Sequence, residues 1–132
     1  MSQENVDALG ASIEAFNRGD FEGILQVLDP EVRFEHRLAA LQGSFVGVDG
    51  VRGWLADLFD HFATGQVHCT DIRDLGDDRV LALGTVRAVG KESGVETELP
   101  YTVLARFRNG RMTEFTDFAD RAKALEAAGL RE

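Results

Sequence analysis

The chain has 132 residues, enough for one domain that buries roughly two thirds of the surface of its unfolded chain. Apolar residues make up 44% and charged residues 28%, which is typical of a folded globule and excludes a disordered chain. The 14 basic and 23 acidic residues give a formal net charge of −9, a field that repels a phosphate backbone and excludes nucleic acid as a partner.

Cysteine content and hydropathy indicate the compartment. The single cysteine, Cys69, excludes an internal disulfide and favours a reducing environment. The first residues lack the basic region and apolar core of a signal peptide, and no apolar run approaches the ~20 residues that cross a bilayer. We therefore expect one domain over residues 1–132, in the cytoplasm and without a membrane partner.

The first half of the chain predicts mainly helices. Apolar residues at three- and four-residue spacing indicate a first helix that ends near Arg18, and Asp20 can cap a second one at about 21–28. Pro30 is expected to stop this second helix before a strand at about 31–36. Residues 37–48 predict a loop. A third helix with a broad apolar stripe then follows, with Asp49 as its cap and Gly65 at its end.

The second half predicts long strands. Asn109-Gly110 lies between two alternating runs, and both residue types tolerate the positive φ angles of a type I′ hairpin turn. Helices before a meander of strands indicate an α+β fold with helices on one face of an antiparallel sheet. The strands are expected at about 66–75, 79–90, 95–108 and 111–119, before a short helix at 121–128.

Asp117 is the first candidate for chemistry. It lies on the same strand face as Phe115, where a desolvated carboxylate would have a raised pKa and could act as a general base. Alternatively, this face reaches solvent near the strand end, or Asp117 pairs with an arginine.

His36 is the second candidate, because it ends a strand whose same-face neighbours, Val32 and Phe34, should point inward. A neutral imidazole there could exchange a proton at about pH 7, because the ordinary pKa of histidine lies close to that pH. The alternative is a histidine at the rim of the core that bonds to backbone. For Arg87 and Arg106 the better interpretation is a charge that reaches solvent from the sheet.

A domain of this size cannot separate its core from the wall of a cavity, so its aromatic residues are expected to serve both. The predicted pocket residues are Phe16, Phe34, Trp54, Leu58, Phe62, Tyr101 and Phe115. No phosphate-binding glycine loop and no nucleophile elbow is present, and the three histidines are scattered, so we expect no metal and no cofactor.

Three segments carry a family resemblance. The sequence IEAFNRGDFEGILQVLDPEV at 13–32 resembles the first helices and strand of the nuclear-transport-factor-2-like superfamily. GRMTEFTD at 110–117 resembles a signature of the SnoaL-like polyketide cyclases, and ALEAAGL at 124–130 is similar to the ending of bacterial members. The resemblance covers essentially the whole chain. It implies a cone in which a curved antiparallel sheet wraps the helices around an apolar cavity, and a homodimer formed through the outer face of the sheet.

The resemblance also suggests roles for individual residues. In the SnoaL-like cyclases the aspartate of the signature is the acid/base for ring closure; Asp117 occupies its place, although Thr116 stands where those enzymes have tryptophan. His36 aligns with the general base of ketosteroid isomerase. The oxyanion-hole residues of that enzyme fall near Ser12 and Pro100, which cannot replace them, so we do not predict steroid isomerisation.

Comparison with limonene-type epoxide hydrolases is weaker still, because they use two aspartates and an arginine. Only Asp117 and either Arg87 or Arg106 can be placed. The leading prediction is a conical cavity that binds a small apolar molecule and acts on it by acid/base chemistry through Asp117 and His36. The rival prediction is a non-catalytic ligand-binding or dimerisation module of the same fold.

Overall fold

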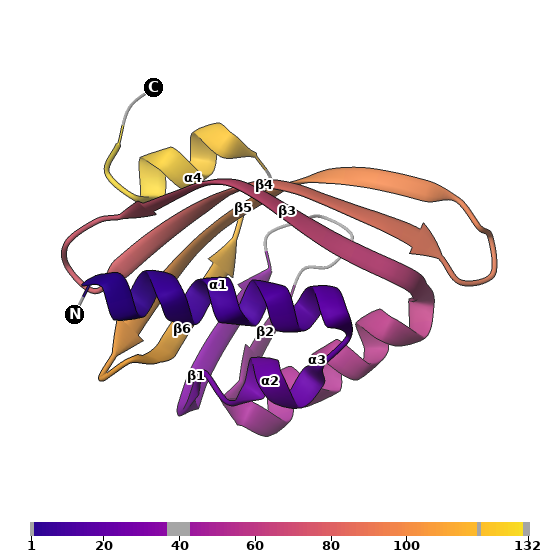
Figure 1. The fold of residues 1–132 in the computed structure, drawn as a ribbon, viewed down its shortest axis with the longest axis horizontal. Coiled ribbons are helices and arrows are strands. Elements are labelled where there is room, and N and C mark those ends of the chain that lie inside the picture. The colour runs from indigo at the N-terminus through magenta and orange to yellow at the C-terminus, as the bar shows by residue number, and fades with distance from the viewer. Residues whose placement is uncertain (1, 37–42, 119, 131–132) are drawn as a thin grey trace.

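The computed structural model describes residues 2–36, 43–118 and 120–130, and these form an α+β fold (Figure 1). Helices lead the chain and long strands follow, as the sequence predicts. In chain order the elements are α1 (Ser2–Arg18), α2 (Phe21–Leu25), β1 (Leu28–His36), β2 (Gly43–Val46), α3 (Gly47–His61), β3 (Phe62–Asp74), β4 (Arg79–Gly90), β5 (Glu96–Arg108), β6 (Arg111–Asp117) and α4 (Arg121–Ala127).

The strands form one six-stranded sheet in the order β2-β1-β6-β5-β4-β3. The pairs along it are antiparallel except β1 with β6, which run parallel. This parallel pair places the first strand of the chain beside the last one, so residues about eighty positions apart become neighbours in the middle of the sheet. The ends of β1 and β6 therefore meet at one place.

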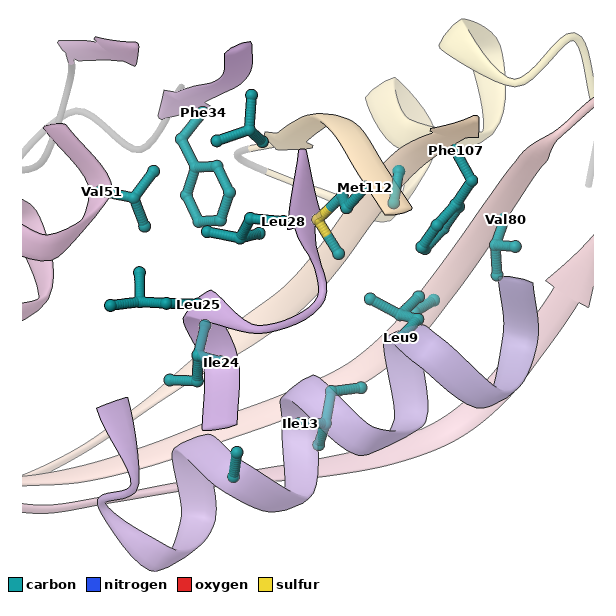
Figure 2. Close-up of a cluster of buried hydrophobic side chains, with 14 of the residues drawn as sticks. Leu9, Ile13, Ile24, Leu25, Leu28, Phe34, Val51, Val80, Phe107 and Met112 are labelled. Atoms are coloured by element: carbon teal, nitrogen blue, oxygen red, sulfur yellow. The ribbon is translucent and has the colours of Figure 1, made fainter. Parts of the chain in front are cut away.

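Helices α1 and α3 lie on one side of the sheet and α4 on the other (Figure 1). Between α1 and the sheet, Leu9 and Ile13 belong to the same buried cluster as Val80 and Phe107 (Figure 2). Leu9 is fully buried, and burying such a side chain stabilises the fold by about 1.5–3 kcal/mol. The three- to four-residue spacing of apolar residues in α1 thus places them on the side of the helix that packs against the sheet.

The outer face of the sheet carries a second buried cluster under α4. Leu81 and Leu83 of β4 pack there with Phe118, Ala124 and Leu125. Asp120 caps α4 by accepting a hydrogen bond from the backbone N–H of Lys123 at 2.8 Å. These contacts within the chain account for apolar residues on the outer face that the family resemblance would assign to a homodimer interface. The homodimer stays a prediction.

Two local predictions are confirmed. Asn109 and Gly110 have φ angles of 54° and 76°, as the type I′ turn between β5 and β6 requires. Asp20 caps α2, since its carboxylate accepts a hydrogen bond from the N–H of Gly23 at 3.0 Å. Within the described residues, no helix has the length and apolar character needed to span a membrane.

Pro30 does not end a helix, contrary to the prediction. Helix α2 already ends at Leu25, and Pro30 lies within β1. The pairing of β1 with β6 shifts register between Leu28 and Arg33. Proline has no N–H to donate, and such an irregular part of a ladder is where a strand tolerates it.

The predicted loop at 37–48 is wrong for part of its length. Residues 43–46 form β2, where Phe45 pairs with Phe34 of β1, and residues 37–42 lie outside the described residues. Helix α3 starts at Gly47 and ends at His61, so Asp49 is not its cap and Gly65 lies in β3. A four-residue strand is too short to show alternation, so only its tertiary pairing identifies it.

Candidate functional site

A pocket of about 160 Å³ lies between helices α1 and α3 and the inner face of the sheet. Most of its wall is aromatic or aliphatic. The exposed Leu99, with 40% of its surface accessible, and Pro100 mark its rim. Its lining includes the seven residues that the sequence analysis proposed for a ligand pocket: Phe16, Phe34, Trp54, Leu58, Phe62, Tyr101 and Phe115.

Aromatic rings of β1, β6 and α3 form one wall of the pocket. Phe34 and Phe115 stack with ring centroids 4.4 Å apart and planes inclined by 17°, and Trp54 meets Phe34 edge-on at 5.8 Å. Phe34 and Phe115 are register partners in the parallel pair of β1 and β6. Strand pairing therefore stacks the rings, and offset or edge-on ring pairs add about 0.5–1.5 kcal/mol beyond the area they bury.

A second group of aromatic residues packs together at another part of the pocket wall. Phe59 of α3 contacts Phe16 at 5.4 Å and Phe21 at 4.7 Å between ring centroids. Val86 and Ala88 also line the pocket but were not among the predicted residues. The signal existed in part, because Val86 and Ala88 occupy alternate positions on one face of β4.

Four residues of the described lining carry polar groups: the hydroxyls of Ser12 and Tyr101, the indole N–H of Trp54 and the carboxylate of Asp117. The hydroxyl of Ser12 donates a hydrogen bond to the carbonyl oxygen of Leu9 at 2.7 Å, so its one proton is already used within α1. Tyr101 and Asp117 are the titratable groups of this lining.

Burial raises the pKa of the Tyr101 hydroxyl above its ordinary value, and the negative charges that Cys69 and Asp117 can carry raise it further. Each of these causes disfavours the phenolate. Tyr101 is thus a neutral hydrogen-bond donor across the physiological pH range. Burial likewise raises the pKa of the Cys69 thiol, which keeps it protonated.

Asp117 is the last residue of β6 and is half-buried. Its register partners are Val103 on β5 and His36 on β1. Tyr101 precedes Val103 by two residues, so it lies diagonally across from Asp117 on the same face of the sheet. A carboxylate and a phenol therefore project from neighbouring strands into one pocket.

The two predicted acid/base residues occupy directly paired positions, because His36 ends β1 beside Asp117. The side chain of His36 lies outside the described part of the structure, so its role stays a prediction. Arg87 and Arg106 do not line the pocket. They make exposed ion pairs, Arg87 with Glu96 at 3.1 Å and Arg106 with Glu114 at 3.5 Å. These pairs fit the prediction that both charges reach solvent. Neither arginine therefore lies in the described lining, where the catalytic arginine of an epoxide hydrolase would be needed.

Among the side chains that the structure describes, which do not include that of His36, no three His, Cys, Asp or Glu residues come together as they would around a metal ion.

The α+β architecture, with its pocket between the helices and the curved sheet, is that of the nuclear-transport-factor-2-like proteins. The profile of the SnoaL-like domain family matches residues 9–115, and the chain belongs to that family. A comparison with curated proteins finds no match.

Solved structures agree with this assignment. An NTF2-like protein of unknown function from Burkholderia pseudomallei is 29% identical, with a TM-score of 0.80 and coverage of 93% of this chain and 95% of that one. TerC, co-crystallized with polyporic acid, is 25% identical, with a TM-score of 0.80 and coverage of 96% and 98%. A candidate polyketide cyclase from Xanthomonas campestris pv. campestris is also 25% identical, with a TM-score of 0.73 and the same coverage.

Proposed function

We propose that the pocket binds a small, mostly apolar molecule and that Asp117 exchanges a proton with it. The observation that carries this proposal is the composition of the lining: mostly aromatic and aliphatic walls around about 160 Å³, with a carboxylate and a phenol among its few polar groups. An enclosed apolar volume of about 150 Å³ binds benzene in another protein, so a ring of that size fits. TerC, which has the same fold, was co-crystallized with polyporic acid, and this supports the binding of an organic small molecule.

The proposed chemistry is proton transfer next to a carbonyl. The carboxylate of Asp117 takes a proton from the carbon α to the carbonyl, the electron pair of the C–H bond forms a C=C bond, and the carbonyl oxygen gains the negative charge. In an isomerisation the proton then returns at another carbon of the enolate. In a ring closure the enolate carbon instead attacks a second carbonyl carbon of the same molecule, the C=O π electrons move to that oxygen, and the resulting alkoxide takes the proton. Neither route needs a cofactor. The aromatic walls exclude water, and electrostatic contacts inside become stronger for that reason. We propose His36 as the second acid/base, since its backbone is paired with that of Asp117.

An NMR titration tests binding first. Isotope-labelled protein is mixed with apolar carbonyl compounds and, separately, with polyporic acid. The indole signal of Trp54 reports occupancy because this is the one tryptophan in the chain. We expect saturable shifts of this signal for at least one compound. Its complete insensitivity to the whole panel would contradict the proposal.

Asp117→Asn then tests the chemistry. The amide has nearly the shape of the carboxylate but cannot take up the proton, so we expect turnover to be lost while ligand binding and folding persist. Equal turnover in the variant would refute the role of Asp117.

One observation favours a non-catalytic module as the second candidate. The Ser12 hydroxyl is bonded to the Leu9 carbonyl, and Pro100 has no N–H to donate, so the positions where ketosteroid isomerase holds its oxyanion donors supply none here. A binding module predicts that wild-type protein and Asp117→Asn bind the same compounds with equal affinity and that neither converts them.

A further inference from the structure

We propose that Tyr101 determines which ligands the pocket accepts, by donating a hydrogen bond from its hydroxyl to a carbonyl or enolate oxygen. The proposal rests on the proposed function and deepens it, because it names the ligand class: compact ketones and their enols, with one acceptor oxygen and an otherwise apolar surface. It also supplies the oxyanion donor that Ser12 and Pro100 do not provide.

The first argument is the hydrogen bonding of the pocket hydroxyls. The Ser12 hydroxyl donates a hydrogen bond to the Leu9 carbonyl oxygen at 2.7 Å. For the Tyr101 hydroxyl, the described residues offer no hydrogen-bond partner, although the side chain is half-buried among apolar residues of the pocket. A hydroxyl withdrawn from water without a partner is unfavourable, and a ligand oxygen that restores the hydrogen bond is favoured over a ligand that cannot.

The second argument is the position of Tyr101 on the sheet. Its register partner on β4 is Gly84, which has no side chain to compete for the space beside the ring. Asp117 lies diagonally across on β6, because its partner on β5 is Val103. A carbonyl oxygen bound at Tyr101 therefore leaves the neighbouring carbon on the side of the carboxylate. This is the arrangement in which Asp117 removes the proton while the charge develops on the oxygen that Tyr101 holds.

The third argument is charge. Burial among apolar side chains and the negative charges that Cys69 and Asp117 can carry disfavour loss of the Tyr101 proton, and the pKa of this hydroxyl is raised accordingly. Tyr101 therefore remains a hydrogen-bond donor across the physiological pH range. The two groups then have opposite tasks, one accepting a proton from carbon and the other stabilising the resulting oxygen charge.

A purely structural role for Tyr101 is the alternative. An aromatic ring opposite a strand glycine covers the exposed backbone there, and Tyr101 would do so over Gly84. Tyr101→Phe keeps the ring and removes the oxygen alone, so it separates the two roles. Thr113→Val is the control, because it removes one hydroxyl at a residue outside the pocket lining, where the hydroxyl donates to the carbonyl oxygen of Arg106 at 3.2 Å.

The experiment compares α-tetralone with tetralin, two bicyclic molecules of nearly the same shape that differ by the carbonyl oxygen. Affinities for both are measured by NMR titration in wild type, Tyr101→Phe and Thr113→Val. We expect Tyr101→Phe to weaken binding of the ketone by about two- to tenfold, the range for one hydrogen bond between neutral groups. Binding of tetralin should not change, and Thr113→Val should bind both as wild type does.

The outcomes separate this inference from the proposed function. If Tyr101→Phe binds the ketone as tightly as wild type, or loses affinity for both molecules equally, the inference is wrong while the apolar pocket stands. If wild type binds neither molecule nor any other compound of the panel, the proposed function fails and this inference fails with it.

Discussion

The sharpest stability prediction compares one substitution, glycine to alanine, at two positions of opposite character. Gly84 lies in β4, where β3 comes unusually close at an irregularity of its register between Cys69 and Asp71. A Cβ atom at Gly84 would clash with the carbonyl oxygen of His68 and would lie 2.8 Å from the Cα of Cys69. Both obstacles are backbone, so β3 itself must move to make room.

The cost follows from this displacement. Overpacking a tight site costs about 1–3 kcal/mol, and a displaced β3 weakens one or two ladder hydrogen bonds worth about 0.5–1.5 kcal/mol each. We therefore expect Gly84→Ala to lower the free energy of unfolding by about 2–4 kcal/mol, a large part of the roughly 5–15 kcal/mol of a typical domain. With an unfolding entropy of about 2.1 cal/mol/K for each of 132 residues, the melting temperature falls by roughly 7–14 °C.

Gly10 is the matched control. It lies inside α1, and a Cβ there meets nothing within 4 Å. Alanine is the better helix former, so Gly10→Ala should raise the free energy of unfolding by about 0.5–1 kcal/mol. The same chemical change thus has opposite signs at the two positions, because only one of them lacks space.

Urea denaturation followed by Trp54 fluorescence and by circular dichroism measures both variants. We expect coincident transitions, with the midpoint lowered for Gly84→Ala and raised for Gly10→Ala. A Gly84→Ala protein within about 0.5 kcal/mol of wild type, less than the smallest overpacking cost, would refute the reasoning about the close approach of β3 and β4.

Three more predictions follow from other contacts. Asn17 makes two hydrogen bonds to the backbone of Val67 on the edge strand β3, at 2.7 and 3.0 Å. Asn17→Ala removes both and should lower the free energy of unfolding, measured by urea denaturation, by about 1–3 kcal/mol. Asn17→Asp keeps one of the two and should lower it by less. Tyr101 is the one tyrosine, and its folded pKa is raised above the ordinary value of 10.0, so tyrosinate absorbance should develop at higher pH in native than in urea-unfolded protein. As the pH rises, the unfolded state loses the proton first, and the free energy of unfolding falls by up to about 1.4 kcal/mol per pH unit between the two pKa values. Tyr101→Phe should not show this fall. Equal pKa values in native and unfolded protein would contradict the burial of the Tyr101 hydroxyl. Finally, we expect light scattering to give twice the chain mass of 14.5 kDa, and a monomer mass would exclude the homodimer.

The parts of the fold that the sequence predicts well are those with a local cause. Asn109 and Gly110 accept positive φ angles, and Asp20 presents a carboxylate to the first turn of α2. In each case the residues that determine the structure lie within a few positions of one another. The strand β2 and the place of Pro30 inside β1 depend instead on pairing with distant strands, which a local pattern does not contain.

The site divides in the same way. That Phe34 and Phe115 are apolar and inward could be predicted from two-residue alternation, but their stacking depends on the parallel pairing of β1 with β6. The same pairing makes His36 and Asp117 register partners. The hydroxyl of Tyr101 could not be recognised as a donor from the sequence, because the described residues that line its pocket come from five strands and three helices.

Proton exchange at carbon is the measurement that tests the central claim most directly. Wild-type protein, Asp117→Asn and a protein-free control are each mixed with α-tetralone in deuterium oxide at neutral pH, and proton NMR follows loss of the signal from the carbon next to the carbonyl. We expect wild type to exchange this proton faster than Asp117→Asn by about the 10²–10⁴-fold that general-base catalysis contributes, while Trp54 shifts show that both proteins bind the ketone. Equal exchange rates in wild type and Asp117→Asn, with the ketone bound to both, would contradict the account.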